Sequence, residues 1–158
     1  MVSGLAQDSR EVNALRLNRL DMAARRVGVV GIEVALTSRR EAGAWAWPKG
    51  PIHVSRALVD LVDDDELAAA IAHELGHLQD DGTWRGPRAA LEGDAGADGE
   101  ARADELGCRL LASRGLPPAA AVRLLEKLGP SVRGGLSERI ARARAACMSL
   151  SDAGPTPR

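Results

Sequence analysis

The sequence of 158 residues predicts an α+β fold, with one N-terminal helix, a small three-stranded sheet and then further helices. Apolar residues recur at helical spacing before residue 27 and again after residue 65, whereas short, alternating, β-branched stretches are confined to residues 27–55. The chain has no internal repeat. Strands and helices that are segregated along a chain are typical of α+β domains rather than of alternating α/β domains.

Length, charge and composition describe one domain, which we expect to span residues 1–150, followed by a disordered tail at 151–158. The formal net charge of −1 gives no electrostatic reason to expect nucleic acid or an anionic membrane as a partner. The chain contains no run of about 20 apolar residues that would span a membrane. Met1–Arg10 lacks the basic and apolar regions of a signal peptide. We therefore expect a cytoplasmic protein, whose oligomeric state does not follow from the sequence.

The N-terminal part divides into a helix and three strands. Asp8–Arg26 has the apolar spacing of an amphipathic helix, with Asp8 or Ser9 as its N-cap. Val27–Leu36 is β-branched and nearly alternating, which predicts the first strand. After a charged turn, residues 44–47 and 52–55 are two short strands separated by a Pro-Lys-Gly-Pro turn. These two strands should form a hairpin-like pair that joins the first strand.

The rest of the chain should be mostly helical. Ser55–Val62 predicts a short helix and Asp65–Leu78 a longer one, and Asp63 with Glu66 has the spacing of a capping box between them. Residues 80–99 are rich in Gly, Asp and Arg and are interpreted as a mobile loop. Three more helices are expected at Glu100–Ser113 (with Gly115 as the C′ residue), Pro118–Leu128 and Ser137–Met148.

One motif within the longer helix indicates chemistry. Residues 73–77 read H-E-L-G-H. Histidines four residues apart on a helix project from the same face, so His73 and His77 can bind one Zn²⁺ at about 2.0–2.1 Å each. Glu74 can then reach a water at the open position and take its proton. A half-buried helix face without metal is the alternative, but two of the chain's three histidines lie in this motif, which favours zinc.

A catalytic zinc requires three protein ligands and one open position. No histidine follows His77, so the third ligand should be a carboxylate. Glu100 and Asp104 lie four residues apart on the next expected helix. We interpret Glu100 as the ligand, and Asp104 as the group that hydrogen-bonds the free N–H of a ligand histidine. Alternatives within the glycine-rich loop, where no helix would position them, are Glu92, Asp94 and Asp98.

The chain resembles the gluzincin zinc metallopeptidases, within them the family of HtpX and the CAAX prenyl endopeptidases. These proteins carry H-E-x-x-H followed by E-x-x-x-D on a second helix, often as E-x-x-A-D, and residues 100–104 read E-A-R-A-D. Residues 44–55 are similar to the strand and glycine turn that precede the metal helix in this family. The likeness runs from about Val29 to Ile140. In size the chain is closest to the minigluzincins, soluble members without transmembrane helices.

The resemblance implies a zincin-like domain that is a metalloendopeptidase, with one catalytic Zn²⁺ and protein or peptide substrates. Its metal ligands would be His73, His77 and Glu100, its general base Glu74, and Asp104 would orient His73. A catalytically inactive or latent zinc-binding scaffold of the same fold is the main alternative. A helical interaction module with an accidental motif is a weaker one.

The group that stabilises the transition state is less well defined. The family usually has a His-Pro pair followed by an arginine near the end. The sequence keeps an arginine at Arg139, but Arg133 and Gly134 stand where His-Pro would fall. Arg139 is the predicted catalytic residue, with Arg133 and His53 as alternatives, and each could equally be a plain surface side chain.

Two further predictions concern the substrate and the cysteines. A peptide could bind by β-augmentation along the predicted strand Ala44, Trp45, Ala46 and Trp47, although the two tryptophans could equally be packed on one sheet face. Cys108 and Cys147 lie far apart without metal-type spacing. Two buried thiols are favoured over a disulfide.

Overall fold

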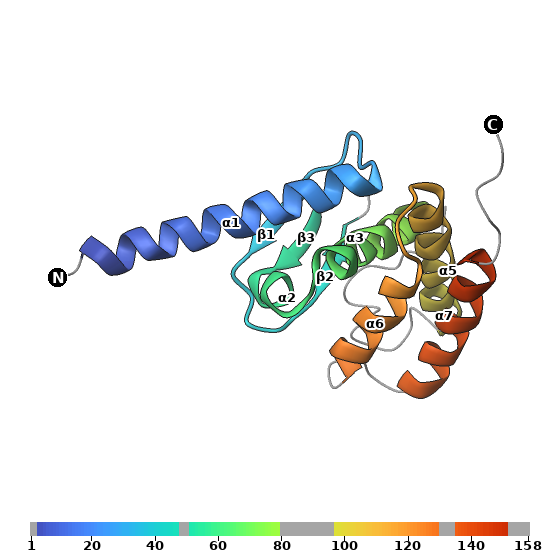
Figure 1. The fold of residues 1–158 in the computed structure, drawn as a ribbon. Helices are drawn as coiled ribbons and strands as arrows, with labels where there is room; N and C mark the ends of the chain where they lie inside the picture. The colour runs from blue at the N-terminus through green and yellow to red at the C-terminus, as the bar shows by residue number, and fades with distance from the viewer. Residues whose placement is uncertain (1–2, 48–50, 80–96, 130–134, 152–158) are drawn as a thin grey trace.

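The computed structural model describes residues 3–47, 51–79, 97–129 and 135–151. Its sheet contains β1 (Val34–Thr37), β2 (Ala44–Ala46) and β3 (Ile52–Ser55), and its helices are α1 (Ser3–Val27), α2 (Arg56–Leu61), α3 (Asp64–Gln79), α5 (Ala97–Ser113), α6 (Ala119–Leu128) and α7 (Leu136–Ser151). The α+β fold class is confirmed. Helix α3 lies at the centre, with α1 and the sheet on one side and α5, α6 and α7 on the other (Figure 1).

Helix α1 begins earlier than predicted. Leu5, Ala6 and Gln7 favour a helix, so the helix continues through Asp8 and Ser9, and the predicted N-cap is wrong. The C-terminal half of α1 packs on the core, and its arginines pair with acids at the end of α2 and at the start of α3. These pairs are Arg16–Asp60 at 2.5 Å, Arg19–Asp64 at 2.8 Å and Arg26–Asp65 at 2.5 Å. Within the described segments, no helix has the length and apolar character that crossing a bilayer requires.

The first strand is shorter than predicted because of two glycines. Gly28 and Gly31 have φ angles of +81° and +73°, outside the extended region, so the prediction of a strand from Val27 onwards is wrong and β1 begins at Val34. The sheet has the order β1-β3-β2, with β3 parallel to β1 and antiparallel to β2. The predicted pairing of the second and third strands is confirmed, and β2 forms one edge of the described sheet.

Local hydrogen bonds fix the start of α3. Asp63 Oδ1 accepts from the N–H of Glu66 at 2.8 Å, and Glu66 Oε2 accepts from the N–H of Asp63 at 2.9 Å. The predicted capping box is therefore confirmed. Glu66 is only 1% exposed, and its charge is balanced by Lys127 at 2.5 Å and Arg123 at 3.4 Å, both from α6. This cluster fixes α6 against the helix that carries the H-E-x-x-H motif.

The three C-terminal helices occur where they were predicted, but α5 and α7 are longer than expected and α6 begins one residue later. Helix α5 begins at Ala97, within the segment interpreted as a loop, and residues 80–96 of that loop lie outside the described residues. Gly115 has a φ of +69° and follows the end of α5, as expected for a C′ residue. Helix α7 continues to Ser151, and the predicted tail after it, 152–158, lies outside the described residues.

Cys108 and Cys147 form a disulfide, so the prediction of two free thiols is wrong. Helix α6 reverses the chain and brings α7 alongside α5, which places the two Cα atoms 5.3 Å apart, a distance that a disulfide spans. Both residues are fully buried, in a small cluster with Val122, Leu125 and Ala143. Spacing along the chain could not reveal this contact because 39 residues separate the two cysteines.

Replacing both Cys108 and Cys147 with alanine should lower the free energy of unfolding by about 4 kcal/mol, because a closed loop of 39 residues restricts the unfolded chain. Urea unfolding of the parent and the double variant measures this difference. Parent protein reduced with dithiothreitol under denaturing conditions and then refolded is the control, since it loses the bond without changing the side chains. Equal midpoints for all three proteins would show that the bond contributes nothing.

Candidate active site

The two histidines of the motif lie one turn apart on α3 and face α5. Their Nε2 atoms are 3.0 Å apart, and their rings meet edge to face with centroids 4.6 Å apart. Both side chains are largely buried. His73 and His77 therefore present their ring nitrogens to one small volume, as the helical spacing required.

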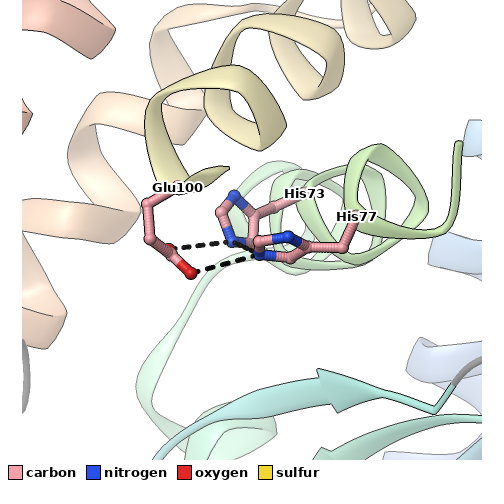
Figure 2. A group of neighbouring side chains, drawn as sticks. All are labelled: His73, His77 and Glu100. Carbon is pink, nitrogen blue, oxygen red and sulfur yellow. Dashed lines mark hydrogen bonds and ion pairs between the residues drawn. The ribbon is translucent and has the colours of Figure 1, made fainter. Parts of the chain in front are cut away.

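Glu100, near the start of α5, faces these two rings (Figure 2). Its Oε2 lies 3.4 Å from Nε2 of His73 and its Oε1 lies 3.3 Å from Nε2 of His77. Ligand atoms about 2.0–2.1 Å from a tetrahedral zinc are about 3.3 Å from one another, so the spacing suits such an ion. Glu92 and Asp94, and the side chain of Asp98, lie outside what the structure describes.

A close crossing of α3 and α5 brings the carboxylates to the histidines. A Cβ at Gly76 would lie 2.7 Å from the backbone oxygen of Ala103, and one at Gly107 would lie 3.2 Å from the backbone N of His73. Each helix thus needs a glycine where it touches the backbone of the other. Gly107 was not identified from the sequence. A glycine inside a helix is unfavourable by about 1 kcal/mol relative to alanine, which is the signal that could have revealed it.

Asp104, one turn after Glu100, is buried against His73. Its Oδ1 lies 2.8 Å from Nδ1 of His73, a contact of the kind predicted for it. With the proton of the imidazole on Nδ1 and donated to Asp104, the lone pair of Nε2 is directed at His77 and Glu100. This is the tautomer that a metal ligand requires.

Arg139, at the start of α7, contacts both carboxylates. Its Nε donates to Oδ2 of Asp104 at 2.9 Å and its Nη2 donates to Oδ1 of the same residue at 3.0 Å. Nη2 also lies 2.8 Å from Oε2 of Glu100. The guanidinium therefore holds the two acidic side chains of α5, and the Cys108–Cys147 disulfide joins the same two helices.

These charges shift the pKa values of the whole group. Burial would by itself raise the pKa of Glu100 and of Asp104, but the neighbouring histidines and Arg139 lower both below their usual range. Burial would also lower the pKa of His73, but Asp104 and Glu100 outweigh it and raise the pKa to about 10. The two carboxylates thus favour a positive charge between them, which a bound cation could supply. Burial raises the pKa of Glu74, which makes its carboxylate a stronger base.

Glu74 projects toward the sheet rather than toward α5. It is 7% exposed, and the backbone N–H of Ala46 on β2 donates a hydrogen bond to its carboxyl group. Side-chain alternation along β3 places His53 on the other face of the sheet, where its ring stacks on Trp45 with centroids 5.6 Å apart. His53 is therefore separated from the histidine–glutamate group by the sheet, and Arg133 lies outside the described residues.

Comparison with known proteins found a family that part of the chain resembles. Residues 12–85 match the model of peptidase family M48. The matched segment includes most of α1, the sheet, α2 and the H-E-x-x-H motif on α3, and it ends before α5. The placement of Glu100 and Asp104 beside the histidines is thus a structural observation, independent of the match. A search of curated proteins found no match. The matched segment and the motif within it lead to one conclusion: residues 12–85, just under half of the chain, are similar to peptidase family M48, a family of metallopeptidases.

Proposed function

We propose that the protein is a zinc-dependent endopeptidase. The observation that carries this proposal is the convergence of two imidazole nitrogens and one carboxylate, 3.0–3.4 Å apart, next to the buried Glu74. Two nitrogens and one carboxylate leave the fourth position of a tetrahedral ion open, as in catalytic rather than structural zinc sites. Zn²⁺ held by His73, His77 and Glu100 would supply a Lewis acid and a water of lowered pKa.

Glu74 is the proposed general base. Its carboxylate takes the proton of the attacking water and then delivers it to the nitrogen of the leaving amine. Its burial supports this role because a carboxylate of raised pKa accepts a proton more readily near neutral pH. The N–H of Ala46 on β2 donates a hydrogen bond to the Glu74 carboxyl group and so fixes the orientation of that group.

Asp104 and Arg139 are proposed to position the metal ligands. Asp104 fixes the tautomer and orientation of His73 through the contact at 2.8 Å. Arg139 was predicted as the catalytic group that stabilises the transition state. Its bonds to Glu100 and Asp104 favour a different role, in which it holds the third ligand in place.

Strand β2 is the proposed binding site for the peptide. It lies at an edge of the described sheet and contacts α3 beside Glu74, so its outer edge runs past the site. A substrate in extended form can add to such an edge through main-chain hydrogen bonds. Ala44, Trp45 and Ala46 form this strand, and Trp47, which is 47% exposed, follows it.

The disulfide is evidence about the cellular compartment in which the protein works. Disulfides persist mainly in oxidising environments such as the periplasm or the extracellular space. The fully buried Cys108–Cys147 bond therefore argues against the expected cytoplasmic location, and we infer that the protein works in an oxidising compartment.

Metal analysis combined with a cleavage assay tests the proposed function. The purified protein should hold about one zinc per chain, cleave casein or a fluorogenic peptide, lose this activity with a chelator and regain it when zinc is added back. Protein that holds zinc but cleaves nothing would support the inactive scaffold. Protein that binds no zinc would exclude both readings.

A further inference from the structure

A row of side chains covers the face of the sheet that points away from α3. Ala44 and Ala46 pack toward the core, so alternation along β2 turns Trp45 to the opposite face, where it pairs with His53 of β3. The two rings stack with an interplanar angle of 18°. The guanidinium carbon of Arg39, from the β1–β2 connection, lies 4.5 Å from the centroid of the Trp45 ring.

Arg39 carries a charge that no acidic residue of the described chain balances. The side chain is exposed, and among the described residues it stacks on Trp45. By contrast, Arg16, Arg19 and Arg26 on α1 are all paired with aspartates. A guanidinium stacked on an indole keeps its N–H groups, which lie in its own plane, available for a carboxylate. Arg39 is thus a positioned cation for which the described residues provide no anion.

The hydrogen-bond pattern of the hairpin determines which residue of a bound peptide would meet this cation. The bonds at either end of β2 join Ser55 N to Gly43 O (2.9 Å) and Trp47 N to Pro51 O (3.5 Å). Along an antiparallel strand, every second residue hydrogen-bonds the same neighbouring strand. Trp45 therefore bonds β3, whereas the N–H and C=O groups of Ala44 and Ala46 point to the outer edge of the described sheet. An antiparallel peptide would bond the N–H and C=O of Ala44 and the C=O of Ala46, whose N–H already donates to Glu74. The peptide residue between those bonds would then face Trp45 in a non-hydrogen-bonded pair, where side chains are closest.

We propose that the substrate residue facing Trp45 is acidic and is recognised by Arg39. Its side chain projects on the outer face of the sheet with Trp45 and Arg39, whereas its two neighbours project on the inner face, toward α3. Because the N–H of Ala46 also reaches Glu74, this position lies close to the cleaved bond. The inference rests on the proposed function, since it requires a peptide on β2. It adds a substrate class, peptides with Asp or Glu at one defined position.

A positional scan of Glu against Gln through a cleaved peptide tests this inference. One position should respond, with kcat/KM about three- to fivefold higher for Glu, while both neighbouring positions do not. Arg39→Ala should remove the preference, and Arg39→Glu should reverse it in favour of Lys. Arg40→Glu is the matched control, because it makes the same charge change at the next exposed residue without a recorded contact to Trp45. High salt should abolish the effect in the parent.

Binding separates this inference from the proposed function. Fluorescence anisotropy with zinc-supplemented Glu74→Gln protein compares the same Glu and Gln peptides without requiring cleavage. If the parent cleaves no peptide, the proposed function fails, but a binding preference that depends on Arg39 would still support the acidic position. A response at the neighbouring positions, a preference that survives in Arg39→Glu, or no peptide binding would each overturn the inference.

Discussion

Glu74→Gln should keep about one zinc per chain and lose about 10²- to 10⁴-fold in kcat/KM for peptide hydrolysis. The amide has nearly the shape of the carboxylate and still accepts the N–H of Ala46, but it cannot take a proton from water. The proposed metal ligands are untouched, because Glu74 projects toward β2 whereas His73 and His77 face Glu100. A fluorogenic peptide assay gives the rate, and mass spectrometry of the native protein gives the metal content.

The control for this experiment is Glu105→Gln, the same chemical change at a side chain that is 47% exposed and pairs with Arg109 on the surface of α5. It should retain full activity. A Glu74→Gln protein that hydrolyses the peptide at the parental rate would remove Glu74 from the role of base. A protein that also loses its zinc would show instead that the substitution disturbs the site.

The parts that could be predicted from the sequence depend on short-range chemistry. The shared face of His73 and His77 follows from helical spacing alone, and the capping box of Asp63 and Glu66 follows from three residues of separation. The pairing of the strands around residues 48–51 followed from turn residues. In each case the interacting groups lie within a few residues of one another along the chain, so the local sequence pattern determines how they are placed in space.

Most of the features that were missed depend on contacts between distant segments, and one, the first strand, depends on local backbone angles. Val27–Leu36 has the composition of a strand, but the positive φ angles at Gly28 and Gly31 overrode it. The disulfide, and the bonds of Arg139 to two carboxylates, exist only because α7 packs beside α5. The periodicity of apolar residues does not indicate that α7 packs beside α5. Glu100 was found because a family resemblance, together with the Glu–Asp spacing, supplied the contact that periodicity could not.

Gly76 and Gly107 show how such a contact is encoded. Each glycine removes one Cβ at a point where the two backbones touch, and together they set the separation of α3 and α5. That separation determines whether Glu100 and Asp104 reach His73. The geometry of the site thus depends on two glycines whose side chains take no part in its chemistry. A search limited to chemically reactive residues does not find such positions.

Glu100→Gln should weaken zinc binding at least about 100-fold, since losing a residue that merely supports a ligand already reduces affinity by 10- to 100-fold. The amide keeps the volume of the side chain but not its charge, and Arg139 retains its two bonds to Asp104. At saturating zinc, affinity weakened 100-fold reduces the stabilisation of the folded state by about 2.7 kcal/mol. Thermal unfolding with and without zinc therefore measures the change independently of activity.

The same experiment decides between the two ways in which Glu100 could act. If it binds the metal, zinc should raise the unfolding temperature of the parent and of Glu105→Gln by the same amount, and that of Glu100→Gln by much less. If it only pairs with Arg139 and the histidines, Glu100→Gln should destabilise the metal-free protein while its zinc-induced shift remains parental. The second outcome would refute the proposed ligand set and the open fourth position with it. The first outcome, a smaller zinc-induced shift for Glu100→Gln, would show that the metal binds both helices, because α3 supplies the two histidines and α5 the carboxylate.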